Sequence, residues 1–91
     1  MHITVQVSAY PLGQSDYLPP IDEAIAALRG PGLDTSVGPL STLVAGEEHL
    51  VWEALRRAFA AVARHGDVVL VATVTNACVG APLGDWEYRP K

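Results

Sequence analysis

The stretch Leu40-Ser41-Thr42-Leu43-Val44-Ala45-Gly46 lies near the middle of the chain and decides the fold. It is a run of branched and hydroxyl-bearing residues that ends in a glycine, which is typical of a buried strand. Glu47 and Glu48 follow directly, and acidic residues favour the start of a helix. We therefore expect a strand over residues 40–46, at the centre of a sheet, and a helix from there to about Arg64.

Two further strands and a helix are predicted ahead of this stretch. Residues 3–10 alternate apolar and polar side chains, as a strand does when one of its faces is buried. Residues 33–37 are few and polar, which favours an edge strand. Between them a helix should open at Pro19-Pro20, with Asp22 and Glu23 complementing the positive end of its dipole. Its apolar stripe is Ile21, Ala24, Ile25 and Leu28.

The second half of the chain repeats the pattern of helix and strand. The predicted second helix has the apolar stripe Val51, Leu55, Ala58 and Val62, with Trp52 and Phe59 on a flank. A last strand should run from Val68 to about Asn76. The order β-α-β-β-α-β predicts an α+β fold of the ferredoxin-like type. We expect a four-stranded antiparallel sheet of order 4-1-3-2, with both helices on one face, in a domain of residues 1–80 and an irregular tail of residues 81–91.

Composition excludes several classes of partner. The chain has 91 residues, a net charge of −4 and only 18% charged residues, with no basic stripe or zinc-ligand spacing for nucleic acid. Its single cysteine, Cys78, cannot form an internal disulfide and suits a reducing compartment, so we expect a cytoplasmic protein. Residues 68–72 are too short an apolar run for membrane insertion, and no signal peptide is expected. The sparse charge predicts that some apolar surface meets another copy.

We expect no catalytic residue, metal ligand or cofactor. Cys78 and His49 should fall at the same end of the sheet, but a lone buried cysteine is more often a small apolar side chain than a nucleophile. Glu47, Glu48 and His49 are adjacent in a predicted helix, so their side chains diverge instead of converging on a metal. An acylphosphatase-type enzyme would need an arginine in the loop after the first strand, and residues 10–18 contain none.

Neutral polar and aromatic residues form the candidate site: Ser8, Tyr10, Tyr17, Ser41 and Thr42. Hydroxyl groups and an aromatic ring at the end of a small sheet can orient and stack a flat heterocycle. Alternatively, the hydroxyls satisfy neighbouring backbone groups and the tyrosines cover the core, and composition alone favours this simpler interpretation.

Three motifs favour the ligand-binding interpretation instead. They are Ser8-Ala9-Tyr10-Pro11-Leu12-Gly13, Leu40 to Gly46, and Thr75-Asn76-Ala77-Cys78-Val79-Gly80. Together they resemble the YkoF-like thiamine/hydroxymethylpyrimidine-binding family, over residues 3 to about 80. The resemblance implies a domain that binds thiamine or its pyrimidine precursor without transforming it, in uptake, salvage or sensing. Carried over by motif, Ser8, Tyr10, Ser41 and Thr42 would bind the aminopyrimidine.

The remaining site and partner predictions are less specific. Asp16 and Glu47 are candidate acidic neighbours for the thiazolium cation, and Asn76 and Tyr17 complete the candidate set. The family pairs two such domains through their sheets, so the resemblance implies a homodimer or a dimer of dimers of this single-domain chain. The open sheet face would carry Thr4, Gln6 and Ser8 beside Thr73 and Thr75. Two alternatives stay open, namely an assembly module without a ligand and a salvage enzyme that uses Cys78.

Overall fold

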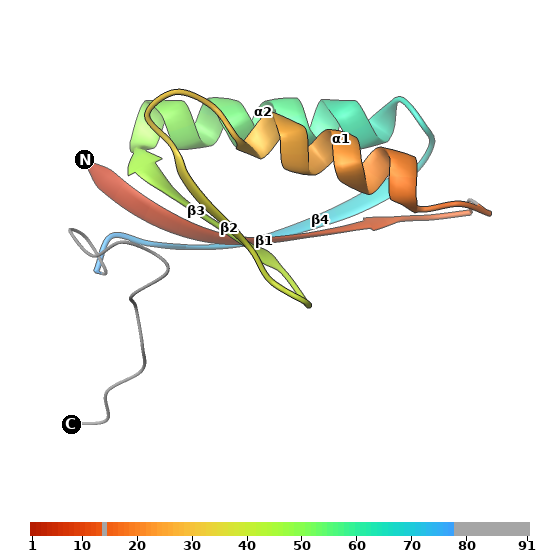
Figure 1. The fold of residues 1–91 in the computed structure, drawn as a ribbon, viewed down its shortest axis with the longest axis horizontal. Coiled ribbons are helices and arrows are strands. Elements are labelled where there is room, and N and C mark those ends of the chain that lie inside the picture. Colours follow the sequence, from red (N-terminus) through yellow and green to blue (C-terminus); the bar gives the residue numbers. More distant parts are fainter. Residues whose placement is uncertain (14, 78–91) are drawn as a thin grey trace.

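The structure is a computed structural model that describes residues 1–13 and 15–77. Strands and helices follow one another in the predicted order along the chain (Figure 1). The elements are β1 (His2–Pro11), α1 (Leu18–Leu28), β2 (Asp34–Val37), β3 (Thr42–Glu47), α2 (Glu48–Ala63) and β4 (Val68–Thr75). Cys78 and the predicted tail of residues 81–91 lie outside the described residues.

The molecule has two layers, a sheet and a pair of helices that both cover the same face of it (Figure 1). The four strands are antiparallel in the order β2-β3-β1-β4, which is the predicted order 4-1-3-2 read from the other edge. This βαββαβ arrangement is the ferredoxin-like fold. The prediction that residues 33–37 form an edge strand is confirmed, and β3 is an interior strand, as the middle stretch predicts.

The core lies between the sheet and the helices, where the buried faces of the strands and of the helices meet. Alternate residues of β1 are buried against the helices, and Val5 is fully inaccessible to solvent. The register pairs Val5 with Val44 of β3, which is also fully buried. The core also contains the predicted helical stripes, of which Ala24, Leu28, Val51, Leu55, Ala58 and Val62 are buried.

Within residues 1–13 and 15–77, no helix covers the opposite face of the sheet, here called the open face (Figure 1), and its composition agrees with the prediction. Gln6 of β1 pairs with Thr73 of β4, and Thr4 pairs with Thr75, so these polar residues share one face. Val69 and Val71 of β4 lie on that face as well, because β-strand side chains alternate. Over the described ranges, no helix is both long and apolar enough to cross a bilayer.

The middle strand begins two residues later than predicted. The backbone N–H of Gly38 donates to the carbonyl oxygen of Ser41 at 2.9 Å, which closes a tight turn around Pro39 and Leu40. Leu40 is consequently 90% exposed, although its apolar side chain suggested a strand residue. At the other end the strand continues through Gly46 to Glu47.

The acidic residues of α1 do not complement its dipole, which corrects the prediction for Asp22 and Glu23. The helix begins at Leu18, so its first turn contains no acidic residue and the two carboxylates fall in the second turn. Glu23 instead joins the two helices, because its Oε2 accepts hydrogen bonds from His65 at 2.7 Å and from Arg64 at 3.0 Å. In α2 the first turn does hold an acidic residue, Glu48.

Candidate functional site

The candidate site lies where β3 separates from β1. Pairing between these strands ends at Val7 and Thr42, whereas pairing of β1 with β4 continues as far as Pro11 and Val68. Among the described strands, residues 8–11 of β1 therefore have a neighbour on one side only. The turn of residues 38–41 folds back near this stretch, and a space remains between it, β1 and α1.

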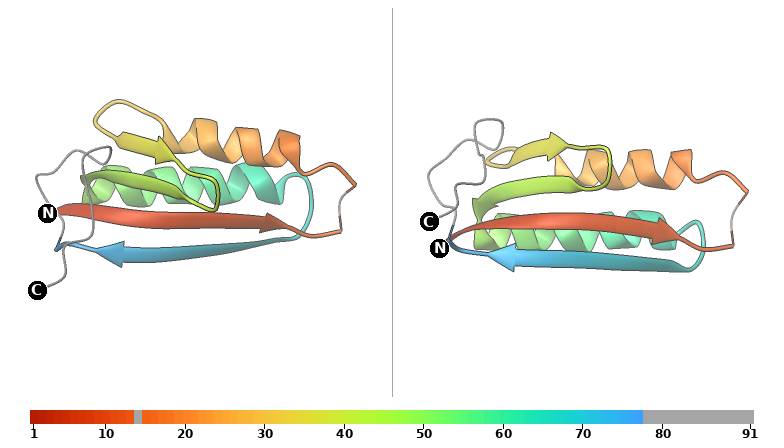
Figure 2. Two further views of the ribbon diagram at one scale, coloured as in Figure 1. Left: turned by 60° about the horizontal axis from the view of Figure 1, so that its bottom comes forward. Right: turned by 90° about the horizontal axis from the view of Figure 1, so that it is seen from below.

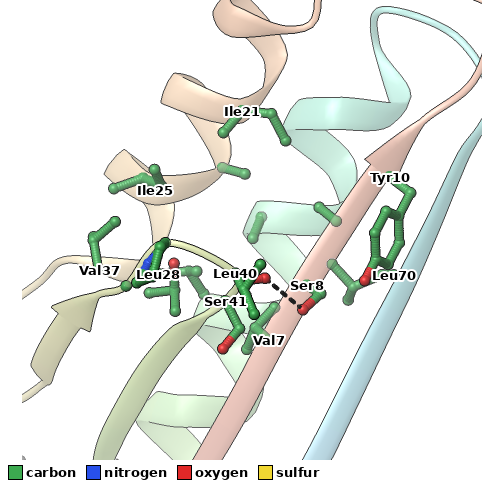
Figure 3. A pocket seen from close by; sticks show the side chains of 16 residues that line it. Val7, Ser8, Tyr10, Ile21, Ile25, Leu28, Val37, Leu40, Ser41 and Leu70 are labelled. Atoms are coloured by element: carbon green, nitrogen blue, oxygen red, sulfur yellow. Dashed lines mark hydrogen bonds between the residues drawn. The ribbon is translucent and has the colours of Figure 1, made fainter.

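This space is a pocket of about 180 Å³. Figure 3 shows Ile21 and Ile25 of α1 on one side, with Leu40 and Ser41 of the turn and Ser8 of β1 facing them. Val7 and Ala9 from the helix side of β1 line the pocket together with Ser8 and Tyr10 from the open side. The pocket therefore extends past the free side of β1, from the helix layer towards the open face.

The lining is mostly apolar with a few hydroxyl groups. Ser8 Oγ donates a weak hydrogen bond to the carbonyl oxygen of Leu40, at 3.5 Å. Ser41 is half-buried, Thr42 is buried, and the exposed ring of Tyr10 lies farther along β1. Among the described lining residues there is no aspartate, glutamate, lysine or arginine. Such a pocket suits a small, uncharged, largely flat group that needs a few directional hydrogen bonds.

The pocket brings together four of the seven predicted site residues: Ser8, Tyr10, Ser41 and Thr42. These come from the two motifs that are 32 residues apart at Ser8 and Leu40. Tyr17 is at the N-cap of α1, half exposed and outside the pocket lining. Asp16 is occupied locally, since its Oδ1 accepts a hydrogen bond from the backbone N–H of Leu18 at 3.1 Å.

Glu47 and Asn76 lie at the opposite end of the sheet. Glu47 pairs with His2 at the beginning of β1, and its Oε2 is 3.2 Å from the amino group of Met1. The hydrogen bond to this carboxylate raises the pKa of the Met1 amine above its ordinary value. Asn76 Nδ2 is 3.6 Å from Met1 Sδ. Neither side chain is placed to contact a ligand in the pocket.

Residue patterns did not single out the apolar walls of the pocket. Ile21 and Ile25 were expected to pack in the core as part of the α1 stripe, but both are only half-buried and line the pocket. Leu70 of β4 also contributes. A signal was present in the sequence, because Gly38-Pro39 places a turn directly before the hydroxyl pair Ser41-Thr42. Pairing of β3 with β1 begins only after that turn, at Thr42.

No metal centre is formed by the part of the chain that the structure describes: no group of three histidine, cysteine, aspartate or glutamate side chains converges there. His49 is exposed on α2. Of the described residues that line the pocket, Tyr10 alone is ionisable, through its phenol. The arrangement can bind and orient a small molecule, and the described residues supply no acid–base pair at the pocket.

The fold and the pocket define a small ferredoxin-like domain with a ligand-sized cavity beside its central strands. The chain belongs to the YKOF-related family, whose sequence model matches residues 2–82. Among curated proteins, none matches this chain.

Solved structures with the same fold include proteins from three organisms. A hypothetical protein from Methanocaldococcus jannascii has a TM-score of 0.78 and 18% identity, covering 89% of this chain and 86% of its own. A Streptococcus pneumoniae protein has a TM-score of 0.76 and 24% identity, covering 93% of each chain. A Thermotoga maritima protein, proposed to act in thiamine biosynthesis or salvage, has a TM-score of 0.76 and 21% identity, covering 91% of each chain. At these identities the similarity shows a shared fold.

Proposed function

We propose that the pocket between α1, β1 and the turn of residues 38–41 binds the pyrimidine half of thiamine, or free hydroxymethylpyrimidine, without transforming it. The observation that carries the proposal is the meeting of Ser8, Tyr10, Ser41 and Thr42 around one apolar pocket. Two motifs of the family resemblance supply these four residues. The family and the Thermotoga maritima protein, proposed to act in thiamine biosynthesis or salvage, support a role related to thiamine.

The size of the pocket favours one ring. A cavity of about 150 Å³ is enough to hold benzene in an engineered protein, and this pocket measures about 180 Å³. A substituted pyrimidine fits that space, whereas pockets for drug-sized ligands measure roughly 300–1,000 Å³. The thiazolium ring of thiamine would therefore project out of the pocket towards solvent.

The lack of charged side chains among the described lining residues also favours a bound pyrimidine ring with the thiazolium ring outside the pocket. A buried cation without a counter-ion is strongly disfavoured, and the described lining has no carboxylate. The neutral aminopyrimidine can instead use the hydroxyls of Thr42, Ser41 and Ser8 as donors or acceptors. The ring of Tyr10 offers an exposed apolar face near the same opening. We thus expect hydroxymethylpyrimidine to be bound nearly as tightly as thiamine.

Isothermal titration calorimetry of the purified protein against thiamine and hydroxymethylpyrimidine, separately, tests the proposal. Saturable binding of either at one site per chain is the expected result. The variant Ile25→Phe should abolish binding, because the added ring occupies the pocket. Thr42→Val keeps the shape and removes one hydroxyl, so affinity should fall about 2- to 10-fold.

A matched control separates a blocked pocket from a damaged helix. Ala26 lies on the exposed side of α1, next to Ile25 in sequence, so Ala26→Phe adds a ring on the solvent side. This variant should bind like the unmodified chain. Absence of heat and of thermal stabilisation with both ligands would contradict the proposal.

A second candidate function is assembly through the open sheet face, with no small-molecule ligand. Tyr10, Val69 and Val71 are about half exposed, at 53%, 47% and 50%, and lie together on that face. Face-to-face packing of two copies would cover them, in a homodimer or a dimer of dimers. If this is the function, the oligomer forms whereas neither ligand binds.

The cytoplasmic location expected from the single cysteine stays a prediction.

A further inference from the structure

Leu40, in the turn of residues 38–41, borders the pocket and yet is 90% exposed to solvent. Figure 2 shows this turn beside α1, with β1 and β4 extending beyond it. A single exposed leucine on a protein surface needs no special explanation. Leu40 differs because it stands at the rim of an apolar pocket, so apolar surface that its side chain could cover lies next to it.

The apolar wall opposite Leu40 is itself partly exposed. Ile21 and Ile25 of α1 are only half-buried, and Val37, directly before the turn, is 45% exposed. The pocket therefore has apolar surface in contact with water, which is unfavourable. Figure 3 shows Leu40 facing the two isoleucines across the pocket. A flat ring bound against the isoleucines would leave its other face in water unless Leu40 covers it.

The Leu40 side chain is free to change position, whereas the base of its turn is held. An exposed side chain has few neighbours to fix one rotamer, and such side chains change rotamer within picoseconds to nanoseconds. The hydrogen bond from the Ser8 hydroxyl to the Leu40 carbonyl oxygen is long, at 3.5 Å, and restrains the apex of the turn only weakly. At the base, the Gly38 N–H donates to the Ser41 carbonyl oxygen at 2.9 Å. The side chain can therefore move while the turn keeps its place.

Building on the proposed function, we propose that Leu40 is the lid of the pyrimidine site. Its side chain folds over the solvent-facing side of the bound ring, which is then held between Leu40 and the isoleucines of α1. The hydroxyls of Ser41 and Thr42 bind polar atoms at the edge of the ring, so the lid and the hydroxyls act on different parts of the ligand. The thiazolium ring of thiamine stays outside the lid. Leu40 thus determines affinity for the flat neutral ring and not for the charged half of thiamine.

The test is isothermal titration of Leu40→Ala with hydroxymethylpyrimidine and, separately, with thiamine. Three carbon atoms that would cover the ring are removed, so affinity should fall about 5- to 50-fold. The factor should be the same for both probes, because they share the pyrimidine ring. Leu40→Met, which is apolar and of similar volume, should bind within about threefold of the unmodified chain. Leu40→Asn, which is polar and of similar size, should lose as much affinity as Leu40→Ala.

Leu12→Ala is the matched control. Leu12 is a half-exposed leucine just after β1 and outside the pocket lining, and its backbone N–H donates to the Asp67 carbonyl oxygen at 2.9 Å. This variant should bind both probes like the unmodified chain. Because Leu40 is exposed in the free protein, Leu40→Ala should leave the melting temperature unchanged, so that its loss of affinity is not a loss of fold.

Nuclear magnetic resonance locates the lid directly. On saturation with hydroxymethylpyrimidine, the Leu40 methyl signals, identified by their absence from the Leu40→Met spectrum, should shift and show a nuclear Overhauser effect to the ring hydrogen. The Leu12 methyl signals should do neither. Equal affinities of Leu40→Ala and Leu12→Ala would overturn the lid and leave the pocket's function intact. A loss of affinity for thiamine alone would also overturn it, since Leu40 would then contact the thiazolium ring. If the unmodified chain binds neither probe, the proposed function fails and the lid fails with it.

Discussion

Replacing Gly46 with alanine should destabilise the fold because there is no room for a methyl group at this position. A Cβ on Gly46 would lie 2.8 Å from the carbonyl oxygen of Gly32 and 3.1 Å from Leu33 Cδ2. Gly46 pairs with the buried Ile3, so the methyl group would point into the helix side of the sheet. The nearest atom belongs to the backbone, and it cannot move away by a change of rotamer.

The expected cost follows from this overlap. Overpacking a core by one methyl group costs about 1–3 kcal/mol when backbone must shift. For a domain of this size, each kcal/mol lowers the melting temperature by about 4–8 °C. We therefore expect Gly46→Ala to lower the melting temperature by roughly 5–20 °C. The loop of residues 30–33 would have to move away from β3.

Thermal and urea unfolding, followed by circular dichroism, measure the effect. Gly30→Ala is the matched control, because a Cβ there meets only Leu33 Cδ1, at an ordinary 3.8 Å. We expect Gly30→Ala either to leave the free energy of unfolding unchanged or to raise it by about 1 kcal/mol, since alanine restricts the unfolded chain. A Gly46→Ala protein as stable as the Gly30→Ala protein would refute the close approach of the loop to β3.

Three further outcomes are expected. Thr35→Val should cost about 0.5–1.5 kcal/mol in urea unfolding, because the Thr35 hydroxyl donates at 2.8 Å to a carbonyl at the end of α1; an unchanged midpoint would contradict it. Val5→Ala should cost about 2–3 kcal/mol by the same assay, since two fully buried methyl groups are lost, and a smaller loss than at an exposed valine would argue against this core. The hydrogen bond with His65, with a further contribution from Arg64, lowers the pKa of Glu23 below its ordinary 4.5. The ionised form is thus favoured in the folded state, so its stabilisation is present at neutral pH and is lost as pH falls through the lowered pKa. The melting temperatures of the unmodified and Glu23→Gln proteins should converge in acid, and a constant difference down to about pH 2 would rule this out.

Most of the fold could be predicted because each element has its own local signal. The alternation in residues 3–10 and the helical stripes of α1 and α2 follow from side-chain periodicity, which does not depend on the partner element. Right-handed crossovers then leave only a few arrangements for six elements in this order. The boundaries were less accurate. Leu40 looked like a strand residue, but the turn hydrogen bond between Gly38 and Ser41 exposes it.

The candidate site could be predicted only in part. Ser8 and Ser41 came from motifs at two strand ends, and antiparallel strands bring those ends together. Glu47 was a plausible partner for a cation, yet it ion-pairs with the Met1 amine at the far end of the sheet. That pairing depends on the register of β1 against β3, which no local pattern specifies.

The sequence by itself determined which segments are strands and helices and which of their faces are apolar, because these follow from spacing along the chain. Tertiary structure alone decided where pairing of β1 and β3 stops, at Val7 and Thr42. That endpoint leaves Ile21 and Ile25 uncovered and creates the pocket. The physical reason is that a cavity is set by the distance between elements, and that distance depends on strand register and on the turn between strands.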